Sequence, residues 1–383
     1  MTRLTPRLQR FIETMPATPV LALDLEVVAE RYRSLESALP GVDLYYAIKA
    51  NPAREVLETL SGLGCRFDVA SVGEVELCRA AGIDGTDLSF GNTIKRSDAI
   101  SAAVSIGVER FSFDSDGELD KLTRLAPGSL VSVRILCDGA GASWPLSRKF
   151  GCSPPDAVAL LRRAGDAGHR LGVSFHVGSQ QLRPEAWDAA LAEVAEMAEA
   201  LDGFGFGLDE VNLGGGFPAS LGDGAPPIED YGAHIMKAVG DRIGGLAADL
   251  VAEPGRYLVA DAGALVSEVV LVARKSPADA VRWVYVDAGV FSGLIEVIGE
   301  AVRYPLSTSR DGGPTEPSIL AGPTCDSIDV LYEQQPVDLP VDLVEGDQVV
   351  FSAAGAYTTT YSSVAFNGFD PLRQVVLAAD DLR

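Results

Sequence analysis

Cysteine and histidine are scarce in this chain, and their spacing indicates no metal site. Five cysteines and three histidines occur among 383 residues. No two cysteines form a Cys-x-x-Cys pair, and an odd number of scattered thiols argues against a disulfide framework. They are Cys65, Cys78, Cys137, Cys152 and Cys325. The sequence therefore predicts no bound metal and a reducing, cytoplasmic location.

Long hydrophobic runs are also missing. A membrane-spanning helix needs about 20 consecutive apolar residues, and no segment approaches that length. The N-terminus, MTRLTPRLQRFIETMP, lacks the apolar core of a secretion signal. We expect a protein that is neither exported nor embedded in a membrane.

Positive charge is in short supply. Lysine and arginine together number 31 against 54 acidic residues, the net charge is -23, and no cluster of basic residues stands out. A nucleic-acid partner, whose phosphates attract basic surfaces, is not expected. An acidic surface attracts cations and so favours a cationic small substrate, although solubility alone explains the charge equally well.

What the sequence does contain is a regular alternation of short β-branched or aromatic runs with amphipathic stretches. This alternation is typical of a parallel sheet with crossover helices. The strand candidates are 42–48, 65–70, 86–91, 110–114, 130–136, 171–177, 210–214 and 249–255. Eight parallel strands close a (β/α)8 or TIM barrel, so the predicted fold class is α/β.

The chain changes character after about residue 262. Strand-like runs at 265–274, 281–288, 317–322 and 347–355 are separated by Gly, Pro and Asp turns, which predicts a C-terminal antiparallel β domain. A further strand at 19–25 precedes the barrel and is a candidate for the same sheet. We therefore predict a barrel domain over 24–262 and a β domain built from 1–23 and 263–383.

Candidate functional residues follow the predicted strands, at the end where barrel enzymes bind their substrates. Lys49 directly follows the first strand and is one of only six lysines. A lysine removed from water has a lowered pKa and forms Schiff bases with aldehyde cofactors. A lysine that reaches from the barrel rim into solvent fits the position equally well.

An anion site is indicated after the seventh and eighth strands. A run of three glycines, 214–216, lets backbone N–H groups approach an anion, and Arg256 adds a bidentate charge. A phosphate beside a reactive lysine suggests pyridoxal phosphate. Glu253 would then face the pyridine nitrogen and His176 would stack on the ring. Each feature has an alternative interpretation. The glycine run could form a tight turn, Glu253 could belong to a buried ion pair, and His176 could be an ordinary core residue.

The sequence resembles the fold-type III pyridoxal-phosphate decarboxylases, the family of ornithine and diaminopimelate decarboxylases with an alanine racemase-like fold. The resemblance spans nearly the whole chain. Its motifs are YYAIKAN (45–51), RFDVASVGEVEL (66–77), RKFG (148–151), FHVGSQ (175–180), LGGGFP (213–218), EPGRYLV (253–259), GPTCDSIDVL (322–331) and GAYTTTYSSVAFNGF (355–369). Together they form a far stronger signal than any one of them.

The resemblance implies a role for each candidate residue of the barrel. Lys49 would hold the cofactor as a Schiff base, and Asp68 and Glu74 would shape its pocket. His176 would stack on the cofactor ring, and Glu253 would pair with the ring nitrogen. The other residues assigned to cofactor binding are Arg134, Ser179, Gly214, Gly215, Gly216, Gly255, Arg256 and, from the β domain, Tyr357.

The resemblance also implies a head-to-tail homodimer whose active sites are shared between subunits. Cys325 of one subunit would protonate the substrate carbon after CO2 leaves, and Asp326 would bind the distal ammonium, both in the other subunit's site. A thiol suits this proton transfer on chemical grounds as well, although a buried apolar role is commoner for a cytosolic cysteine.

The implied substrate is a basic amino acid, most simply ornithine or lysine. The CDSID segment at 325–329 differs from the Cys-Glu-Ser-Gly-Asp of diaminopimelate decarboxylases. Ornithine enzymes place a Tyr-Asp pair where this chain has Glu296 and Glu300. We assign both glutamates, with Tyr357, to substrate binding, and chain-length preference and a diaminopimelate-type substrate stay open.

Two other functions compete with decarboxylation. An amino-acid racemase shares the fold and the Schiff-base chemistry, but a racemase needs a base on each face of the substrate carbon, and the Cys325–Asp326 pair favours a decarboxylase. A catalytically inactive regulatory relative would have lost cofactor-binding or proton-donating residues. This chain keeps Lys49, Glu253, Arg256 and Cys325.

Overall fold

The computed structural model describes residues 4–144, 149–222 and 224–378, which fold into two compact units. The barrel unit comprises Ala29–Pro218 and Pro226–Leu258. The β unit comprises Met1–Val28, Ala219–Ala225 and Val259–Arg383. Each is described by itself below.

Eight parallel strands form the closed barrel that the sequence predicted, so the α/β barrel fold is confirmed. A separate two-stranded sheet pairs β7 (Ala142–Trp144) with β9 (Ser179–Gln181). The barrel strands are, in order, β2 (Val42–Ala47), β3 (Arg66–Val69), β4 (Leu88–Phe90), β5 (Arg110–Phe113), β6 (Leu130–Arg134), β8 (Arg170–Ser174), β10 (Glu210–Asn212) and β11 (Asp249–Ala252).

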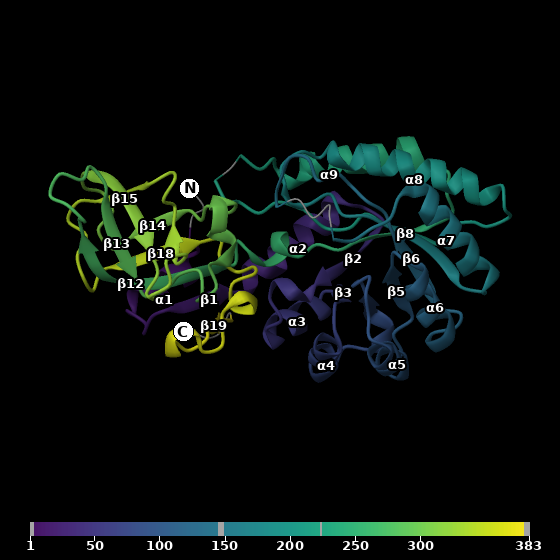
Figure 1. Cartoon of the computed structure of the whole chain (residues 1–383), viewed down its shortest axis with the longest axis horizontal. Helices are drawn as coiled ribbons and strands as arrows, with labels where there is room; N and C mark the ends of the chain where they lie inside the picture. Colours follow the sequence, from purple (N-terminus) through teal and green to yellow (C-terminus); the bar gives the residue numbers. More distant parts are fainter. Residues whose placement is uncertain (1–3, 145–148, 223, 379–383) are drawn as a thin grey trace. The chain divides into compact units, whose positions relative to one another are not determined.

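Crossover helices flank the barrel strands (Figure 1). Local sequence explains where they begin: Ser71 accepts a hydrogen bond from the Glu74 N–H, and the Glu74 carboxylate accepts one from the Ala70 N–H at 2.6 Å. The helices are α2 (Leu25–Ala38), α3 (Arg54–Ser61), α4 (Val72–Ala80), α5 (Ser97–Ser105), α6 (Asp116–Leu125), α7 (Pro154–Asp166), α8 (Ala186–Asp202) and α9 (Ile228–Ile243).

A buried ion pair joins strands at the N-terminal end of the barrel. Glu210, the first residue of β10, pairs with Arg110, the first residue of β5. Glu210 also accepts a hydrogen bond from Ser132 Oγ at 3.0 Å. Burial raises the pKa of Glu210, and the charge of Arg110 opposes that rise. This end of the barrel therefore carries polar contacts that join strands.

The β unit contains a nine-stranded mixed sheet. Most strand pairs are antiparallel, as expected, but β1–β19 and β13–β15 are parallel. Neither parallel pair is joined by a hairpin, and only a hairpin forces two strands to be antiparallel. The strands are β1 (Val20–Asp24), β12 (Gly263–Ala273), β13 (Arg282–Val286), β14 (Leu306–Thr308), β15 (Thr315–Ala321), β16 (Val330–Leu331), β17 (Val337–Pro340), β18 (Gln348–Ser352) and β19 (Arg373–Leu377).

Three short stretches that lie within the predicted barrel range, 24–28, 219–225 and 259–262, belong to the β unit. The longest of them, Ala219–Ala225, is an excursion from the middle of the barrel sequence. The Ser220 N–H donates to Asp261 Oδ1 at 3.1 Å, and Leu221 packs in the β unit's core. The burial of Leu221 and this hydrogen bond therefore hold the segment in the β unit.

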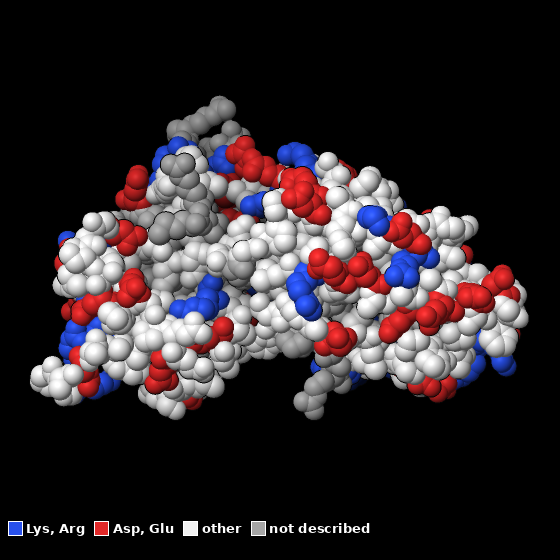
Figure 2. All heavy atoms as spheres, turned by 90° about the horizontal axis from the view of Figure 1, so that it is seen from above, with Lys and Arg blue, Asp and Glu red and all other residues white. Residues whose placement is uncertain are grey.

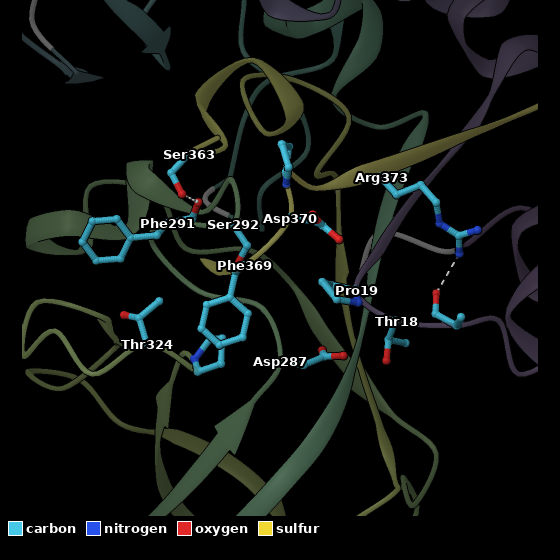
Figure 3. Close-up of a pocket in the computed structure, with 13 residues that line it drawn as sticks. Thr18, Pro19, Asp287, Phe291, Ser292, Thr324, Ser363, Phe369, Asp370 and Arg373 are labelled. Atoms are coloured by element: carbon cyan, nitrogen blue, oxygen red, sulfur yellow. Dashed lines mark hydrogen bonds between the residues drawn. The ribbon is translucent and has the colours of Figure 1, made fainter. Parts of the chain in front are cut away.

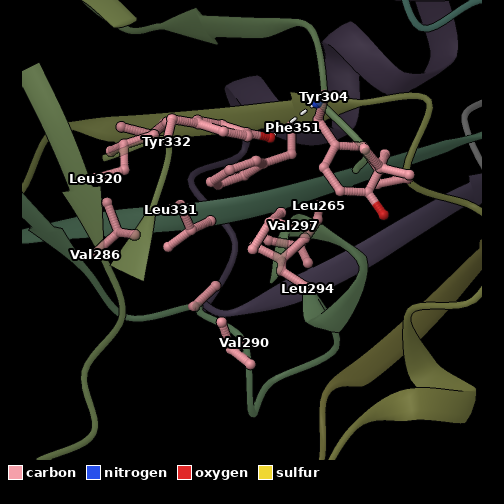
Figure 4. Packing of buried hydrophobic residues seen from close by; sticks show 14 of the residues in the cluster. Leu265, Val286, Val290, Leu294, Val297, Tyr304, Leu320, Leu331, Tyr332 and Phe351 are labelled. Carbon is pink, nitrogen blue, oxygen red and sulfur yellow. Dashed lines mark hydrogen bonds between the residues drawn. The ribbon is translucent and has the colours of Figure 1, made fainter. Parts of the chain in front are cut away.

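The β unit has two hydrophobic cores. The larger one contains Leu265, Leu331 and Phe351, and Tyr332 accepts a hydrogen bond from the Tyr304 N–H at 2.8 Å beside them (Figure 4). In the smaller one, Leu8 of helix α1 (Pro6–Glu13) packs against β1, β12, β18 and β19.

The surface is charged in a mixed pattern. On the face shown in Figure 2, acidic side chains are interspersed with lysine and arginine. Among the residues that the structure describes, no helix is long and apolar enough to cross a bilayer.

The larger core of the β unit can be tested at Phe351, whose side chain is fully buried. Phe351→Ala should lower the free energy of unfolding by about 3–5 kcal/mol because it opens a large cavity. Urea unfolding followed by circular dichroism measures the change. Val364→Ala truncates a side chain that is 80% exposed and should alter the value by less than about 0.5 kcal/mol. Equal effects of the two substitutions would contradict this core.

Candidate active site

Lys49 lies in the 3-10 helix η1 (Ile48–Ala50), immediately after β2. Its Nζ is 3.2 Å from Asp68 Oδ2, and its side chain is 49% exposed, whereas that of Asp68 is 3% exposed. One alternative in the sequence analysis was a lysine removed from water. The Lys49 side chain is instead half-exposed in this structure. A buried carboxylate on the neighbouring strand β3 positions the amine, which stays open to a ligand.

Asp68 has one further feature that points to a ligand. Its Oδ1 atom is buried without a hydrogen-bond partner among the described residues. Gly91 makes room for this carboxylate, since a Cβ there would lie 2.1 Å from Asp68 Oδ1. The amine and the carboxylate together form a polar group at the C-terminal end of the barrel.

Glu253 follows β11 and is tied to both neighbouring strands. Its Oε1 accepts a hydrogen bond from Asn212 Nδ2 at 2.7 Å. The Ala47 N–H, at the end of β2, donates to Pro254 O at 2.9 Å. Burial, and then the nearby charge of Asp68, raise the pKa of Glu253 to about 7, while Lys49 opposes the rise. The Glu253 carboxylate therefore takes up a proton more readily than an ordinary glutamate does.

His176 follows β8 and is held as a neutral ring. Its Nδ1 lies 3.0 Å from the Gly178 N–H, which can only donate, so Nδ1 carries no proton. Burial, followed by the positive charges of Arg134 and Lys49, lowers the pKa of His176 well below its ordinary value. An uncharged imidazole suits packing against an aromatic ligand.

The glycine run after β10 leaves no space for side chains. A Cβ at Gly214 would lie 1.9 Å from Phe175 O, one at Gly215 would lie 2.6 Å from Glu253 O, and one at Gly216 would lie 2.4 Å from Gly178 O. Gly214 and Gly216 also have φ values of 68° and 113°. The run is therefore required by close backbone approach and by conformation.

Arg256 lies beside Ser179 at the start of the short helix α10 (Arg256–Val259). Its Nη2 and Nε atoms are 3.3 and 3.4 Å from Ser179 Oγ, and the arginine is 4% exposed. Gly255 precedes it and is also buried. A buried guanidinium and a hydroxyl form an anion-binding pair.

An aromatic cluster supports this loop from the helices α8 and α9. The rings of Trp187 and Tyr231 pack edge to face, with centroids 5.6 Å apart. Trp187 Nε1 donates to Leu213 O at 3.0 Å, and the Tyr231 hydroxyl donates to Gln181 O at 2.7 Å. The Gln181 N–H in turn donates to Gly216 O at 2.9 Å. The anion site therefore rests on a packed layer.

Arg134 ends β6, and its guanidinium lies 5.8 Å from the centre of the Phe150 ring. Phe150 belongs to the RKFG motif, whose first residue, Arg148, is outside the described residues. Arg134 contributes positive charge near both His176 and Glu253.

The barrel residues fit pyridoxal phosphate chemically. An accessible amine suits its aldehyde, the glycine run with Arg256 suits its phosphate, and the part-buried carboxylate of Glu253 suits its pyridine nitrogen. The unpartnered oxygen of Asp68 supports a polar occupant.

Cys325 and Asp326 lie on the β unit, in the connection between β15 and β16. Cys325 is exposed, and its N–H donates to Asn367 Oδ1 at 3.0 Å. The buried Asp329 accepts hydrogen bonds from Thr324 Oγ1 at 2.7 Å and from the Val290 N–H at 2.7 Å. Two side chains thus fix the segment that presents the thiol.

The remaining predicted residues also lie on the β unit. Glu300 accepts hydrogen bonds from the N–H groups of Gln334 and Gln335 at 2.6 and 3.1 Å, so its carboxylate already anchors a loop. Glu296 is buried in η3 (Ile295–Glu300). Tyr357 has a positive φ of 57°. The substrate-binding roles of all three stay predictions.

Sequence reasoning missed three polar residues that shape the site. Asn212 holds Glu253, while Asn367 and Asp329 hold the Cys325 segment. The signal for Asn212 was an amide at the end of a buried strand, two residues before the glycine run. Asn367 and Asp329 lie inside motifs that resemble the family, but neither had been given a role.

The β unit also contains a cavity of about 320 Å³. Figure 3 shows that its lining includes the carboxylates of Asp287 and Asp370, the Phe369 ring and Thr324. Thr324 directly precedes Cys325, so the cavity lies close to the segment that carries the thiol.

Several known proteins are similar to this chain in sequence and in fold. Residues 25–260 match the family model described as pyridoxal-dependent decarboxylase, pyridoxal binding domain. Lysine/ornithine decarboxylase from Selenomonas ruminantium is 36% identical over 355 residues, which cover 92% of this chain and 88% of that protein. Ornithine decarboxylase from Mus musculus is 31% identical over 362 residues, which cover 90% and 77%. The crystal structure of lysine/ornithine decarboxylase complexed with cadaverine from Vibrio vulnificus has a TM-score of 0.88 and 33% identity, covering 98% and 100%.

Gly215→Ala tests the glycine-lined anion site. The added Cβ would lie 2.6 Å from Glu253 O, so the loop must shift. We expect the affinity of the apoprotein for pyridoxal phosphate, measured by fluorescence titration, to fall about tenfold or more, or about 1.4 kcal/mol. Gly245→Ala is the control, because a Cβ there meets nothing within 4 Å. Unchanged affinity in Gly215→Ala would exclude this loop as the phosphate site.

Proposed function

This chain belongs to the pyridoxal-dependent decarboxylase family, and we propose that it removes the α-carboxylate of ornithine or lysine to release the corresponding diamine. It is a carbon–carbon lyase, and its cofactor is pyridoxal phosphate. The observation that carries the proposal is the grouping of Lys49, Glu253 and a glycine-lined anion site at the C-terminal end of one barrel.

Each barrel residue has a proposed task. Lys49 Nζ holds the cofactor aldehyde, and Asp68 keeps the amine in place. Backbone N–H groups of the glycine run, with Ser179, Gly255, Arg256 and, from the β unit, Tyr357, hold the phosphate. Arg134 adds positive charge near the ring.

Glu253 and His176 act on the ring itself. The Glu253 carboxylate holds a proton on the pyridine nitrogen, and the neutral imidazole of His176 covers one face of the ring. Pyridoxal phosphate, when bound, supplies an electron sink for the electron pair that remains on Cα after CO2 leaves.

The β unit would complete the site from a second subunit of a homodimer. The Cys325 thiol donates a proton to Cα, and the Asp326 carboxylate binds the distal ammonium of the substrate. Cys325 is exposed, and its loop is fixed by hydrogen bonds that Asn367 and Asp329 accept, which supports presentation to a partner. All five cysteines are free thiols, which supports a reducing cytoplasm as the working compartment.

The choice of substrate rests on charge. A basic amino acid carries a second cation, and Asp326 is an exposed carboxylate on the loop that presents the thiol. One similar crystal structure holds cadaverine, the diamine that lysine decarboxylation yields. Glu296 and Glu300 are proposed to adjust the preferred chain length.

The decisive experiment compares CO2 release from L-ornithine, L-lysine, L-arginine and diaminopimelate. Ornithine or lysine should be the best substrate, and Lys49→Ala should lose both activity and the visible absorbance of lysine-linked cofactor. Lys237→Ala, which alters a surface lysine on α9, should retain both. Fastest release from diaminopimelate would overturn the proposed substrate, and a borohydride-trappable cofactor in Lys49→Ala would overturn the proposed role of that lysine.

A mixing experiment tests the shared active site. Lys49→Ala and Cys325→Ala proteins should each be nearly inactive but regain activity together once subunits exchange. Random exchange makes half of the dimers mixed, each with one intact site, so activity should approach about a quarter of the wild-type value. Absence of recovery, with exchange verified by mass spectrometry, would place Cys325 in the same subunit's site.

A further inference from the structure

Asn212 uses both ends of its amide at the centre of the barrel site. It is the last residue of β10 and is 3% exposed. Its Nδ2 donates to Glu253 Oε1 at 2.7 Å, and its Oδ1 accepts from the Gly214 N–H at 2.8 Å. A backbone N–H can only donate, so the amide oxygen must face Gly214 and the NH2 must face Glu253.

We propose that Asn212 is a positioning residue that keeps the Glu253 carboxylate charged and ties it to the phosphate-binding loop. The proposal deepens the proposed function, because it rests on Glu253 facing the cofactor nitrogen. The same amide contacts Glu253 and the glycine loop, so it would fix the distance between the group that faces the ring nitrogen and the loop that binds the phosphate.

The charges around Glu253 show why a donor is needed there. Lys49 on η1 and Arg134 at the end of β6 favour its ionised form, whereas burial and Asp68 on β3 favour the protonated form. Burial and Asp68 prevail, since the pKa of Glu253 is raised to about 7. The hydrogen bond from Asn212 favours the ionised carboxylate, so its loss would raise the pKa further.

Aspartate at position 212 separates the two contacts of the amide. It has nearly the same shape and keeps an acceptor for the Gly214 N–H, so the phosphate loop stays anchored. It replaces the donor to Glu253 with a second carboxylate at hydrogen-bonding distance. Two carboxylates so close must share a proton, which raises the apparent pKa of the pair.

The test follows two properties of the Asn212→Asp holoenzyme between pH 5 and 9, the absorbance of the bound cofactor and kcat. We expect the acidic limb of both profiles to move up by about one pH unit or more, which lowers kcat about tenfold below that limb. Activity should return at high pH, and the bound pyridoxal phosphate per subunit should match the wild-type value. Glu253→Gln should remove the limb, which identifies the titrating group.

The control is Asn92→Asp, which adds the same charge after β4, where the side chain makes hydrogen bonds to backbone atoms of Ala70 and Ile94. Its pH profile should match that of the wild type. A limb that stays in place in Asn212→Asp, with lower thermal stability alone, would overturn the proposal and leave Asn212 a structural residue. If Asn212→Asp does not fold, Asn212→Ala removes the donor without adding charge and should still raise the limb.

The absorbance titration does not depend on decarboxylation. A wild-type protein that binds pyridoxal phosphate but releases no CO2 would refute the proposed reaction. The comparison of absorbance limbs would still decide whether Asn212 controls the charge of Glu253.

Discussion

Closure of eight parallel strands into one barrel is the constraint on which the active site depends. The strands all end at the same rim, so Lys49, Asp68, His176 and Glu253, which are spread over about 200 residues of sequence, come within electrostatic range of one another. The opposite rim carries the buried pair of Glu210 and Arg110, which joins β10 to β5. The candidate catalytic residues therefore lie at one end of the barrel, and this ion pair between strands lies at the other.

The charged groups of the candidate site shift one another's protonation, and partial burial adds to these shifts. Burial alone would leave Glu253 and His176 both neutral. The hydrogen bond from Asn212 and the positive charges of Lys49 and Arg134 counteract burial at Glu253. At His176 the same two cations reinforce it. One pair of basic residues therefore favours the charged form of Glu253 and the uncharged form of His176.

Hydrogen bonds between loops fix the position of the Cys325 segment in the β unit. The hydrogen bonds of Asp329 to the Thr324 hydroxyl and to the Val290 N–H join two loops, and Asn367 adds a third. The exposed Cys325 therefore lies on a segment that is held by the buried Asp329 and the exposed Asn367. Such support restricts the orientation of the loop while the thiol stays exposed.

The sequence by itself determined the eight barrel strands, Lys49, the glycine run and the family, because hydrophobic periodicity and motifs are written in neighbouring residues. The tertiary structure alone decided the contact between Asn212, which ends β10, and Glu253, which follows the adjacent strand β11, 41 positions further along the chain. It also decided that β1 and β19 pair in parallel, and that Leu221 joins the β unit's core. Strand register and packing between distant segments follow from the whole fold, and no local pattern encodes them.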